Sequence, residues 1–372
     1  MKIGIDARQL SRPLTGMGRY TLEICQALSK IKGISLYLYS PAPLCFDFIG
    51  LEKSNVRTKN WDAGILRQFW TETFLAVWAA RDGVDVFWGP AHRIPRFLPD
   101  KMARVVTIHD LVWKYAGDTM PPLRRKLEQI QIPSAIAHAD WIVTDASATA
   151  IALKDEYPES ENKISVIHLG VTYQDCPFSK KDLETLGIDQ DYFLFVGTLE
   201  PRKNLHRLLT SYSLLPASIK NKALFVIAGG KGWCGVDIEK TVRDLELERH
   251  VRLVGYANDA MLAALYQHAL FLAMPSIYEG FGLPLTEAMA HGTPVLTSDN
   301  SSMPEVAGEA GLLVDPLSVD SIEEGLMALI SNGELRGRLA YRAKDSAKRF
   351  DWDVSATKLV DVFKKAVDVR RK

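Results

Sequence analysis

The chain is poor in cysteine and has no excess of charge of either sign. Its four thiols show no CxxC or other metal-ligand spacing; they are Cys25, Cys45, Cys176 and Cys234. So few, scattered cysteines predict free thiols in a reducing cytosol rather than a disulfide framework or a zinc site. Lys plus Arg and Asp plus Glu balance at 45 each. The composition therefore lacks the basic excess typical of proteins whose main partner is nucleic acid.

Long hydrophobic runs are absent too. No run of eighteen apolar residues occurs, so we expect no membrane-spanning segment. The chain opens on a strand-like run, Lys2–Ala7, which predicts a cytosolic protein without a signal peptide. Hydrophobic residues make up 47% of 372, as in an ordinary globular protein, and this length exceeds the usual limit for one core. We therefore expect two domains.

Apolar strand-like runs alternate with helical patterns along the whole chain, which predicts an α/β fold with parallel sheets. In the first half the runs are Lys2–Ala7, Ser35–Tyr39, Val84–Trp88, Val105–His109, Trp141–Thr144 and Ile164–Leu169. In the second half they are Tyr192–Gly197, Leu224–Ala228, Val251–Val254, Phe271–Met274, Val295–Ser298 and Leu312–Val314. Each half has enough strands for a Rossmann-like, doubly wound sheet of its own.

The join between the halves is predicted in the polar stretch 170–190. We expect an N-terminal domain over 1–172 and a C-terminal domain over 185–351. The tail 352–372 has the pattern of an amphipathic helix. Because ligands of such sheets bind beyond the carboxyl ends of the strands, residues just after strands are the candidates for a site.

One segment, Tyr278–Ala290 (YEGFGLPLTEAMA), carries the strongest signal. It follows the apolar run Ala269–Pro275 and enters a helix through a loop broken by Gly280 and Gly282. These glycines let backbone approach a bulky ligand, and the helix start behind them offers free amides to an anion. Two glutamates eight positions apart flank the loop. Their spacing alone means little, but in this context it points to a ligand site.

This Glu-x7-Glu segment resembles the signature of the retaining, two-domain (GT-B-type) glycosyltransferases of family 4, and the chain is most similar there to bacterial mannosyltransferases of surface-polysaccharide assembly. The resemblance implies two Rossmann-like domains facing a cleft, the first on the acceptor side and the second binding the nucleotide sugar, with the terminal helix crossing back onto the first domain. It implies that Glu279 bonds sugar hydroxyls near the reacting centre and that Glu287 accepts bonds from the ribose. The donor would also contact the loop between them: Gly280, Phe281, Gly282 and Leu283.

A second loop, Gly197–Asn204, follows the first strand of the second half. Arg202 and Lys203 stand there before a helical pattern, where the helix dipole disfavours cations, so an anionic diphosphate is a better explanation than a solvated pair. The family often places an arginine directly after the glycine and a lysine later. Lys203 matches the lysine, but Thr198 occupies the arginine's place. Arg202 is our candidate for the missing cation.

In the first half, Gly16 and Gly18 open a helix after the first strand. A dinucleotide fingerprint is excluded, because Thr21 replaces its third glycine and the second strand ends at Ser40 rather than at an acid. The resemblance implies instead a glycine loop that closes over the donor phosphate or the acceptor. A tight turn into the helix remains the alternative.

Polar residues also follow two later strands of the first half. His109 and Asp110 end the run that begins at Val105, and the family carries a histidine here that touches the donor sugar or the acceptor. Asp110 orients the imidazole or caps the next segment. Asp145 and Ser147 follow the next strand, where an acceptor-side role and a helix N-cap explain them equally well. Weaker candidates are His92, His168 and Glu305.

Two features leave alternatives open. The basic segment 121–126 and the aromatic segment 66–78 fit a peripheral contact with anionic lipid, but also a solvated helix face and a core stripe. For metals, the sequence has no HExxH or Cys cluster, and Asp351-Trp352-Asp353 begins the tail helix rather than following a mid-chain strand. We predict no metal and no cofactor.

The sequence thus predicts a retaining, metal-independent glycosyltransferase. Its partners would be a nucleotide sugar, most simply GDP-mannose, and a glycan or lipid-linked glycan of surface-polysaccharide synthesis. Cations and helix amides would stabilise the leaving diphosphate. Two other classes stay open: a sugar-nucleotide epimerase of the same fold, and a non-catalytic protein that only binds sugar nucleotides.

Overall fold

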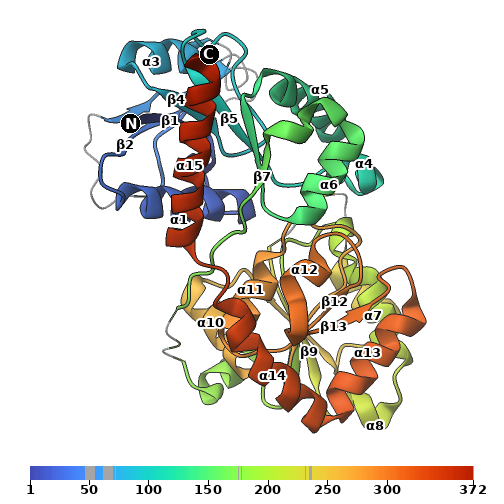
Figure 1. Ribbon diagram of the computed structural model, residues 1–372. Coiled ribbons are helices and arrows are strands. Elements are labelled where there is room, and N and C mark those ends of the chain that lie inside the picture. Colours follow the sequence, from blue (N-terminus) through green and yellow to red (C-terminus); the bar gives the residue numbers. More distant parts are fainter. Residues whose placement is uncertain are drawn as a thin grey trace. The chain divides into compact units, whose positions relative to one another are not determined.

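The computed structural model describes residues 1–46, 55–61, 70–71, 73–174, 176, 178–230, 232–233 and 237–371. Cys234 and parts of the aromatic segment 66–78 and of the join 170–190 lie outside these residues. The chain forms two compact units (Figure 1). Unit 1 consists of Met1–Leu111, Lys126–Gly170 and Asp351–Lys372, and unit 2 of Val112–Arg125 and Val171–Phe350.

The structure assigns Val112–Arg125 to unit 2, whereas the predicted domain ranges place this segment in the first domain. In the structure it belongs to unit 2 because its apolar side chains pack there. Val112, Ala116 and Met120 form a buried cluster against Ile277 and Tyr278. Apolar residues in a short helical stretch do not reveal which of two units will cover them, so the sequence alone could not assign this segment.

The sheet of unit 1 has seven parallel strands among the described residues, in the order β3-β2-β1-β4-β5-β6-β7. The strands are β1 (Lys2–Asp6), β2 (Ser35–Ser40), β3 (Val56–Thr58), β4 (Val86–Gly89), β5 (Ala103–Ile108), β6 (Trp141–Thr144) and β7 (Ile164–Val166). Strand β5 is buried at all six positions, as its mainly apolar composition predicts, although it includes Arg104 and Thr107.

The sheet of unit 2 has six described parallel strands in the order β10-β9-β8-β11-β12-β13. They are β8 (Tyr192–Val196), β9 (Leu224–Ala228), β10 (Val251–Gly255), β11 (Leu272–Met274), β12 (Val295–Ser298) and β13 (Gly311–Val314). Stacked aromatic rings fill the centre of its core, with Phe193 4.5 Å from Phe225 and 5.1 Å from Phe271 between ring centroids. The predicted fold, two Rossmann-like parallel-sheet domains, is confirmed.

Each sheet has one point at which the strand order reverses. In unit 1 this point lies between β1 and β4, and in unit 2 between β8 and β11. At such a point the loops leaving neighbouring strands diverge to opposite faces, which opens a crevice at the carboxyl edge. Loops that follow β8 and β11, and those that follow β1, β4 and β5, are therefore where the structure can build a site.

Strand β3 was not predicted. Its three residues, Val56 to Thr58, are half-buried or exposed and carry an arginine in the middle. A short edge strand of this kind has no apolar run to mark it, since one of its sides lacks a neighbour. Its place is set by pairing with β2, where Leu38 lies opposite Val56.

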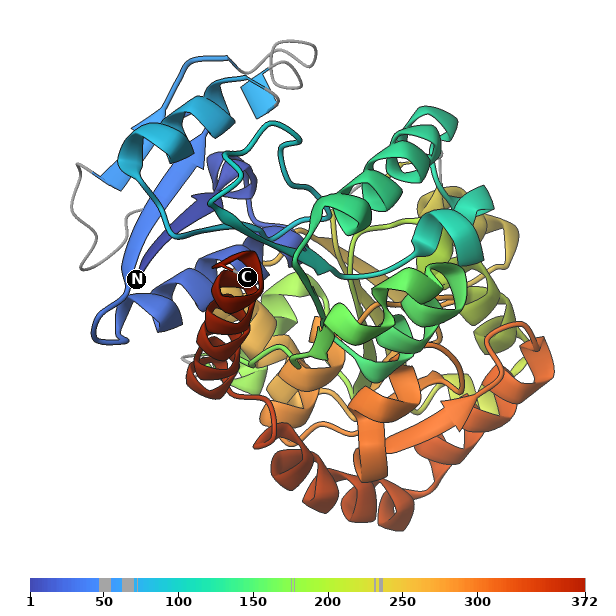
Figure 2. The same ribbon diagram turned by 45° about the horizontal axis from the view of Figure 1, so that its top comes forward.

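The helices of unit 1 surround its sheet. They are α1 (Gly16–Ser29), α3 (Phe74–Asp82), α5 (Pro122–His138, which begins in unit 2), α6 (Ser147–Glu156) and α15 (Trp352–Arg371), with the 3-10 turns η1 (Arg8–Ser11) and η4 (Pro158–Lys163). The tail helix α15 runs beside α1 in both views (Figures 1 and 2) and packs on β4, β5 and β6. The predicted return of the C-terminal helix to the first domain is confirmed.

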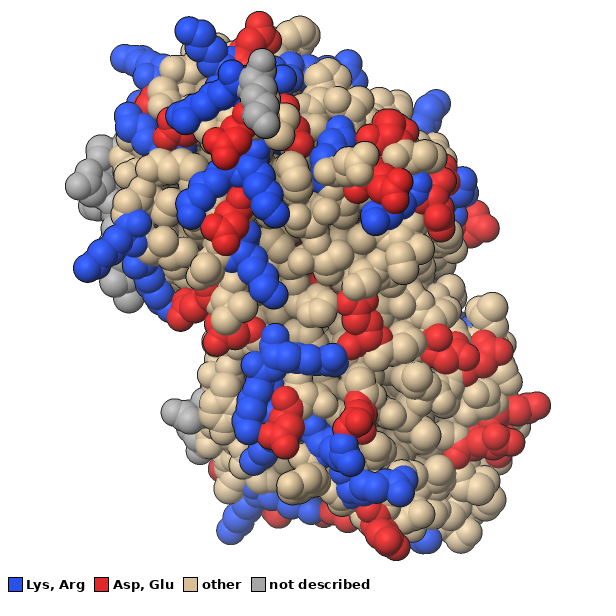
Figure 3. Space-filling view, viewed as in Figure 1, with Lys and Arg blue, Asp and Glu red and all other residues tan. Residues whose placement is uncertain are grey.

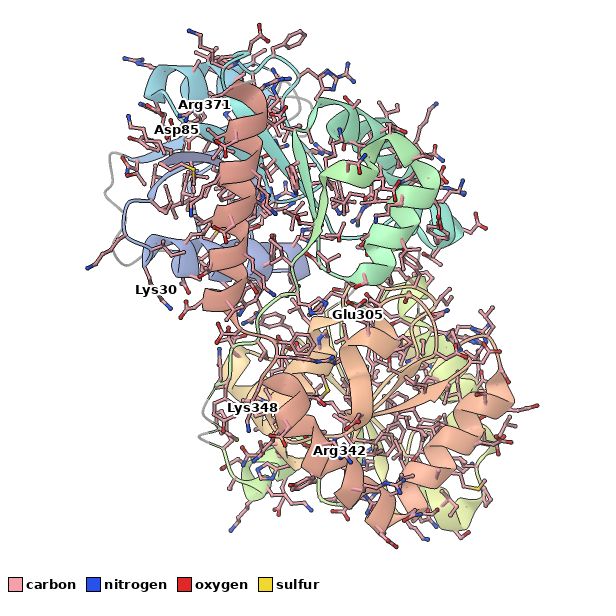
Figure 4. The ribbon with its side chains drawn as sticks, viewed as in Figure 1. Lys30, Asp85, Glu305, Arg342, Lys348 and Arg371 are labelled. Atoms are coloured by element: carbon pink, nitrogen blue, oxygen red, sulfur yellow. The ribbon has the colours of Figure 1, made fainter. Side chains whose placement is uncertain are left out.

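Helix α15 is anchored to unit 1 by its apolar stripe and by its first turn. Ala356, Leu359 and Phe363 are buried at helical spacing. Lys30, labelled in Figure 4 near the start of α15, forms an exposed ion pair with Asp353 at 3.0 Å. Such an exposed pair contributes little, so burial of the stripe supplies most of the attachment.

Helices flank the second sheet as well. They are α4 (Val112–Tyr115), α7 (Leu205–Leu214), α8 (Ala217–Lys220), α9 (Ile238–Asp244), α10 (Asp259–His268), α11 (Leu283–Ala290), α12 (Met303–Ala307), α13 (Val319–Ser331) and α14 (Gly333–Ala347), with the 3-10 turns η3 (Gly117–Thr119), η5 (Lys180–Leu186), η6 (Pro201–Lys203) and η7 (Gly308–Ala310). On the face shown in Figure 3, acidic and basic side chains are interspersed over each unit, in keeping with the zero formal net charge.

Candidate active site

The loops after β8 and β11 meet at the reversal point of the second sheet. Parallel neighbours end at the same edge, so the turn η6 after β8 comes beside the loop after β11. The backbone N–H of Ile277 donates to the carbonyl oxygen of Arg202 at 2.9 Å and fastens the two loops together. Arg202 and Lys203 thereby reach Glu279, although more than seventy residues separate them in sequence.

Glu279 holds both predicted cations. Arg202 Nη1 donates to its Oε2 at 2.5 Å and Lys203 Nζ donates to its Oε1 at 2.7 Å. All three side chains are at least 86% buried, since their exposed fractions are 14%, 12% and 7% for Arg202, Lys203 and Glu279. Burial alone would raise the pKa of Glu279, but the two cations outweigh it and lower that pKa to about 2. The carboxylate is ionised throughout the physiological range.

Backbone contacts fix Glu279 from the loop after β12. The N–H of Glu279 donates to Ser301 Oγ at 3.2 Å, and Ser302 Oγ donates to the carbonyl oxygen of Glu279 at 3.0 Å. Ser301 has a left-handed backbone, with φ of 51°, which is uncommon for serine. Neither serine was predicted, because no local pattern marks a side chain that supports a loop from a neighbouring strand.

A second carboxylate, Glu200, stands on the other side of the guanidinium. Its Oε2 lies 3.5 Å from Arg202 Nη2 and has no hydrogen-bond partner among the described residues. Glu200 is only 6% exposed. Burial raises its pKa above the ordinary value, against the opposing effect of Arg202 and Lys203. Glu200 was not predicted as a site residue; the available signal was its place in the same loop, two positions before Arg202.

Thr198, at the family arginine's position, belongs to the same loop, and its carbonyl oxygen accepts the N–H of Glu200 at 2.8 Å. Gly197 before it has a φ of 153°, and a Cβ there would lie 3.6 Å from Lys203 Cε. The glycine therefore lets the backbone turn close beside the lysine side chain. It is Arg202, not Thr198, that shares the carboxylate of Glu279 with Lys203.

The glycine loop before α11 depends on one strained position. Gly282, at the N-cap, has a φ of 95°, and a Cβ there would lie 2.6 Å from Met303 Cε. Only glycine fits this backbone and space. Gly280 and Phe281 are buried, and the Phe281 ring packs edge-on against Phe350 at 5.4 Å. Leu283, half-buried, opens the helix, and Pro284 occupies its first turn.

Glu287 lies one turn further along α11. It is half-buried, and Tyr266 Oη donates to its Oε2 at 2.8 Å. Tyr266 itself is 1% exposed, so its hydroxyl holds the carboxylate in a fixed orientation. Glu287 and Glu279 thus leave the same short segment toward different partners. The structure places both on one loop–helix unit, and their separate roles toward a donor stay predictions.

In unit 1, His109 follows β5 and is held at both ring nitrogens. Nδ1 lies 2.5 Å from Asp145 Oδ2, and Nε2 lies 2.7 Å from the carbonyl oxygen of Pro90. Both partners are acceptors, so both nitrogens must donate, which only the charged imidazolium can do. Burial works against that charge, yet Asp145 and the Pro90 carbonyl together raise the pKa of His109. The ring is a fixed positive charge, with neither nitrogen left to accept a proton.

Of three further predicted residues, Asp145 and Asp110 act on this histidine, whereas Ser147 is exposed at the start of α6. Asp145 is 2% exposed, and its Oδ1 has no hydrogen-bond partner among the described residues. It is not a helix cap, since the N-cap of α6 is Ala146, and Ser147 is the first residue of that helix. Asp110 is half-buried, and its charge contributes to the raised pKa of His109. The structure therefore brings Asp145 and His109 together and gives Asp110 a weaker, electrostatic influence.

Residues beyond the predicted set complete the surroundings of His109. The Tyr20 ring packs edge-on against the imidazole at 4.9 Å, and Tyr20 Oη and Trp88 Nε1 both reach Thr107 Oγ1, at 3.2 and 3.0 Å. His92 Nε2 accepts the backbone N–H of His109 at 3.0 Å. His92 thus supports the loop rather than facing a ligand. Pro90 and His92 follow β4, so only the strand order shows that they neighbour β5.

The glycines at the start of α1 differ from each other. Gly16 is exposed, and a Cβ there would meet nothing within 4 Å, whereas a Cβ at Gly18 would lie 3.2 Å from the Leu14 side chain. Sterics inside unit 1 thus do not require glycine at 16. Before them, and not predicted, Asp6 at the end of β1 holds Arg8 at 2.6 Å, with both side chains buried.

The basic segment at the start of α5 has internal contacts. Arg125 Nη1 pairs with Asp118 at 2.7 Å, and the Arg124 guanidinium lies 4.6 Å from the centre of the Trp233 ring. Leu123 beside them is 72% exposed. A membrane contact of this segment stays a prediction. Among the described residues no helix is long and apolar enough to cross a bilayer, and no group of three or more His, Cys, Asp or Glu side chains could hold a metal.

Comparison with known proteins connects this geometry to a family. A family model described as Glycosyltransferase Family 4 matches residues 14–174, and one described as Glycosyl transferases group 1 matches residues 179–346. Among known proteins, the O-antigen chain mannosyltransferase B of Escherichia coli is 31% identical over 386 residues, covering 98% of this chain and all of the relative.

Solved structures show the same fold at lower identity. Sucrose-phosphate synthase from Thermosynechococcus elongatus matches with a TM-score of 0.77 and 20% identity, covering 98% of both chains. WaaG, a glycosyltransferase involved in lipopolysaccharide biosynthesis, matches with a TM-score of 0.74 and 18% identity, covering 98% of this chain and 99% of its own. With a relative of 31% identity along its whole length, the chain belongs to the family 4 glycosyltransferases of the two-domain GT-B fold, as its Glu-x7-Glu segment predicts.

Proposed function

We propose that this glycosyltransferase moves mannose from GDP-mannose onto a glycan or lipid-linked glycan of a surface polysaccharide, with retention of anomeric configuration. The observation that carries the proposal is the pair of buried cations on Glu279 at the reversal point of the second sheet. The identity of the sugar is supported by the relative named an O-antigen chain mannosyltransferase.

Arg202 and Lys203 would hold the donor diphosphate. Buried cations in a fixed position stabilise the charge that develops on a leaving phosphate better than solvated ones, because they need not reorganise. The first-turn amides of α11, behind Gly282, add further positive potential to the same loop cluster. Glu287, oriented by Tyr266, would accept bonds from the two ribose hydroxyls.

Glu279 would bond hydroxyls of the transferred sugar while keeping its pairing with Lys203. Its low pKa makes it a charge-stabilising group rather than a proton carrier. In the front-face route, the acceptor oxygen attacks the anomeric carbon on the side from which the diphosphate leaves. The acceptor's proton passes to a departing phosphate oxygen, and no enzyme nucleophile is required. Arg202 and Lys203 would take over the task of neutralising the diphosphate, so this route requires no metal.

Incubation with labelled GDP-mannose and candidate lipid-linked acceptors tests the proposal. Transfer should release GDP and give a glycoside whose anomeric configuration, measured by NMR coupling, equals that of the donor. Parallel UDP-, ADP- and dTDP-sugars test the donor. An altered nucleotide sugar without glycoside would show an epimerase instead, and tight binding without turnover on any acceptor would show a binding protein. The surface variant Glu248→Gln serves as the matched control, since Glu248 is exposed.

A further inference from the structure

Two carboxylates share one guanidinium in the loop cluster of unit 2, and they are held very differently. Glu279 has close bonds to both cations, at 2.5 and 2.7 Å. Glu200 approaches only Arg202, at 3.5 Å, without a hydrogen bond on that oxygen. Arg202 is already positioned by Glu279 and by the Tyr278 carbonyl oxygen at 2.8 Å. Glu200 is therefore not needed to hold the guanidinium in place; what it adds is charge.

The charges of this cluster cancel when every group is ionised. Arg202 and Lys203 are offset by Glu279 and Glu200, so these four groups together offer an incoming diphosphate no excess of positive charge, and Arg124 has the smallest influence on Glu200 of the charged groups around it. A nucleotide sugar brings a negative charge on each of its phosphates. Placing them beside two buried carboxylates would be costly, because charges interact strongly where water is excluded. Neutralising one carboxylate leaves the cluster with net positive charge.

We propose that Glu200 is a positioning residue that takes up a proton when the nucleotide sugar binds. The neutral side chain then no longer attracts the Arg202 guanidinium, which is left to pair with the diphosphate. This inference rests on the proposed function, since it requires a diphosphate ligand at this cluster. Glu279 cannot play the same part, because its two close ion pairs keep it ionised. Glu200 becomes a neutral carboxylic acid and turns from a competitor for Arg202 into a hydrogen-bond donor.

Among the described residues, four charged groups act on Glu200. Burial is the largest influence and raises the pKa of Glu200 above its ordinary value. Arg202 and Lys203 on the same loop lower it, Glu279 on the loop after β11 raises it, and Arg124 at the start of α5 lowers it. A diphosphate would add negative charge and screen the two nearest cations, so it moves the pKa further upward. Binding and protonation then favour each other.

Calorimetry of GDP-mannose binding without acceptor, in buffers of different ionisation enthalpy, measures the protons taken up. A nucleotide sugar is the right probe, because a free nucleoside diphosphate has a terminal phosphate that titrates near neutral pH. The wild type should take up a fraction of a proton, at most about one per site, in the pH range between the pKa of Glu200 in the free protein and its higher pKa in the complex. Its affinity should fall with rising pH, by up to about ten-fold per unit.

Glu200→Gln should bind the donor with no proton uptake and with an affinity independent of pH, whereas the surface variant Glu248→Gln should match the wild type. Glu200→Asp keeps a titrating carboxylate and should retain proton uptake on donor binding. If Glu200→Gln does not fold, proton uptake by the wild type and by Glu200→Asp tests the inference instead. The inference is overturned if the wild type binds GDP-mannose without proton uptake, or if Glu200→Gln takes up as many protons as the wild type. A folded wild type that binds no nucleotide sugar would overturn the proposed function itself.

Discussion

Each unit of this glycosyltransferase buries a charged residue with ionic partners at the carboxyl edge of its sheet, and His109 in unit 1 can be compared with Glu279 in unit 2. Glu279 follows β11, which borders the reversal point of its sheet, and His109 follows β5, which is one strand further from the reversal point of its own sheet. Both residues are less than a tenth exposed. The partners of the two residues differ in their net charge. His109 pairs with one ion, Asp145, and one neutral carbonyl, whereas Glu279 pairs with two cations. The first pair sums to zero, and the second cluster has a cation in excess unless Glu200 is ionised.

The charge of His109 is fixed by its own unit, whereas the net charge of the Arg202 and Lys203 cluster can change. The His109 ring has both nitrogens committed inside unit 1, so its position and charge are set before any ligand arrives. The Arg202 and Lys203 cluster depends on titration of Glu200 for its net charge, so it can respond to an anion. A histidine can also lose its proton as pH rises, whereas an arginine such as Arg202 stays charged. The variants below use that contrast.

The largest effect is expected from removing the carboxylate of Glu279. Glu279→Gln leaves the two buried cations with Glu200 as their nearest described carboxylate, and Glu200 makes no hydrogen bond to either of them through its Oε2. Breaking a buried ion pair costs about 3–5 kcal/mol of unfolding free energy. Asp145→Asn should cost less at pH 8, because His109 can become neutral. Urea denaturation of both variants, with exposed Glu248→Gln as the control, measures the difference. Equal losses at pH 8 would remove the contrast between the two units.

Donor binding should depend on unit 2 through Glu287. Glu287→Ala removes a charged acceptor for ribose hydroxyls and should weaken nucleotide binding by about 1.5–3 kcal/mol. Tyr266→Phe keeps the carboxylate but frees its orientation, and should weaken binding less. Calorimetry with GDP-mannose measures both. An unchanged affinity in Glu287→Ala would refute the ribose role.

Turnover should separate the two cations. Lys203→Ala and Arg202→Ala each remove charge that would stabilise the leaving diphosphate, and each should lower kcat by at least about ten-fold. Steady-state kinetics with saturating donor measures this. If Arg202→Ala has wild-type kcat while Lys203→Ala does not, Arg202 does not replace the arginine that the family places where Thr198 stands.

The two units should lose stability at opposite ends of the pH range. The pKa of His109 is raised above its ordinary 6.5, so its pairing stabilises the fold fully below that pH and is lost as pH rises through the folded value. The pKa of Glu279 is lowered from 4.5 to about 2, so its contribution is present above 4.5 and is lost as pH falls toward 2.

Melting curves from pH 3 to 9 measure this contrast. Asp145→Asn should differ most from the wild type below pH 6.5, and Glu279→Gln should differ least at the acid end. The exposed residue Asp155 on α6 supplies the control Asp155→Asn. A stability difference for Asp145→Asn that grows with pH would contradict a protonated His109.

The smallest effect is expected from metal removal. If the cations of unit 2 alone neutralise the diphosphate, dialysis against EDTA should change transfer by less than about two-fold, and Mg²⁺ should add little. Activity that disappears on chelation and returns only with Mn²⁺ would show that a metal holds the diphosphate, and Arg202 and Lys203 would lose that role.

Local pattern determined much of this protein. Apolar runs such as Val105–Ile108 mark buried parallel strands because their side chains must leave water on both faces of the sheet. Lys203, Glu279 and His109 were proposed without a structure because they follow such runs, where α/β sheets bind ligands, and because they match a lysine, a glutamate and a histidine of the family that the chain resembles. The glycine-broken segment before α11 indicated the family, and the comparisons with known proteins confirm that the chain belongs to it.

Tertiary structure alone decided which of these residues meet. The order of strands brings Arg202 to Glu279 and Asp145 to His109, and no periodicity in the sequence records that order. It also decided that Glu200 is buried beside Arg202 with an unbonded oxygen, and that the Pro90 carbonyl makes His109 a cation. Strands form from contacts between near neighbours in sequence. The charge state of a buried group instead depends on every atom within a few ångströms, and those atoms come from loops that only the folded sheet assembles.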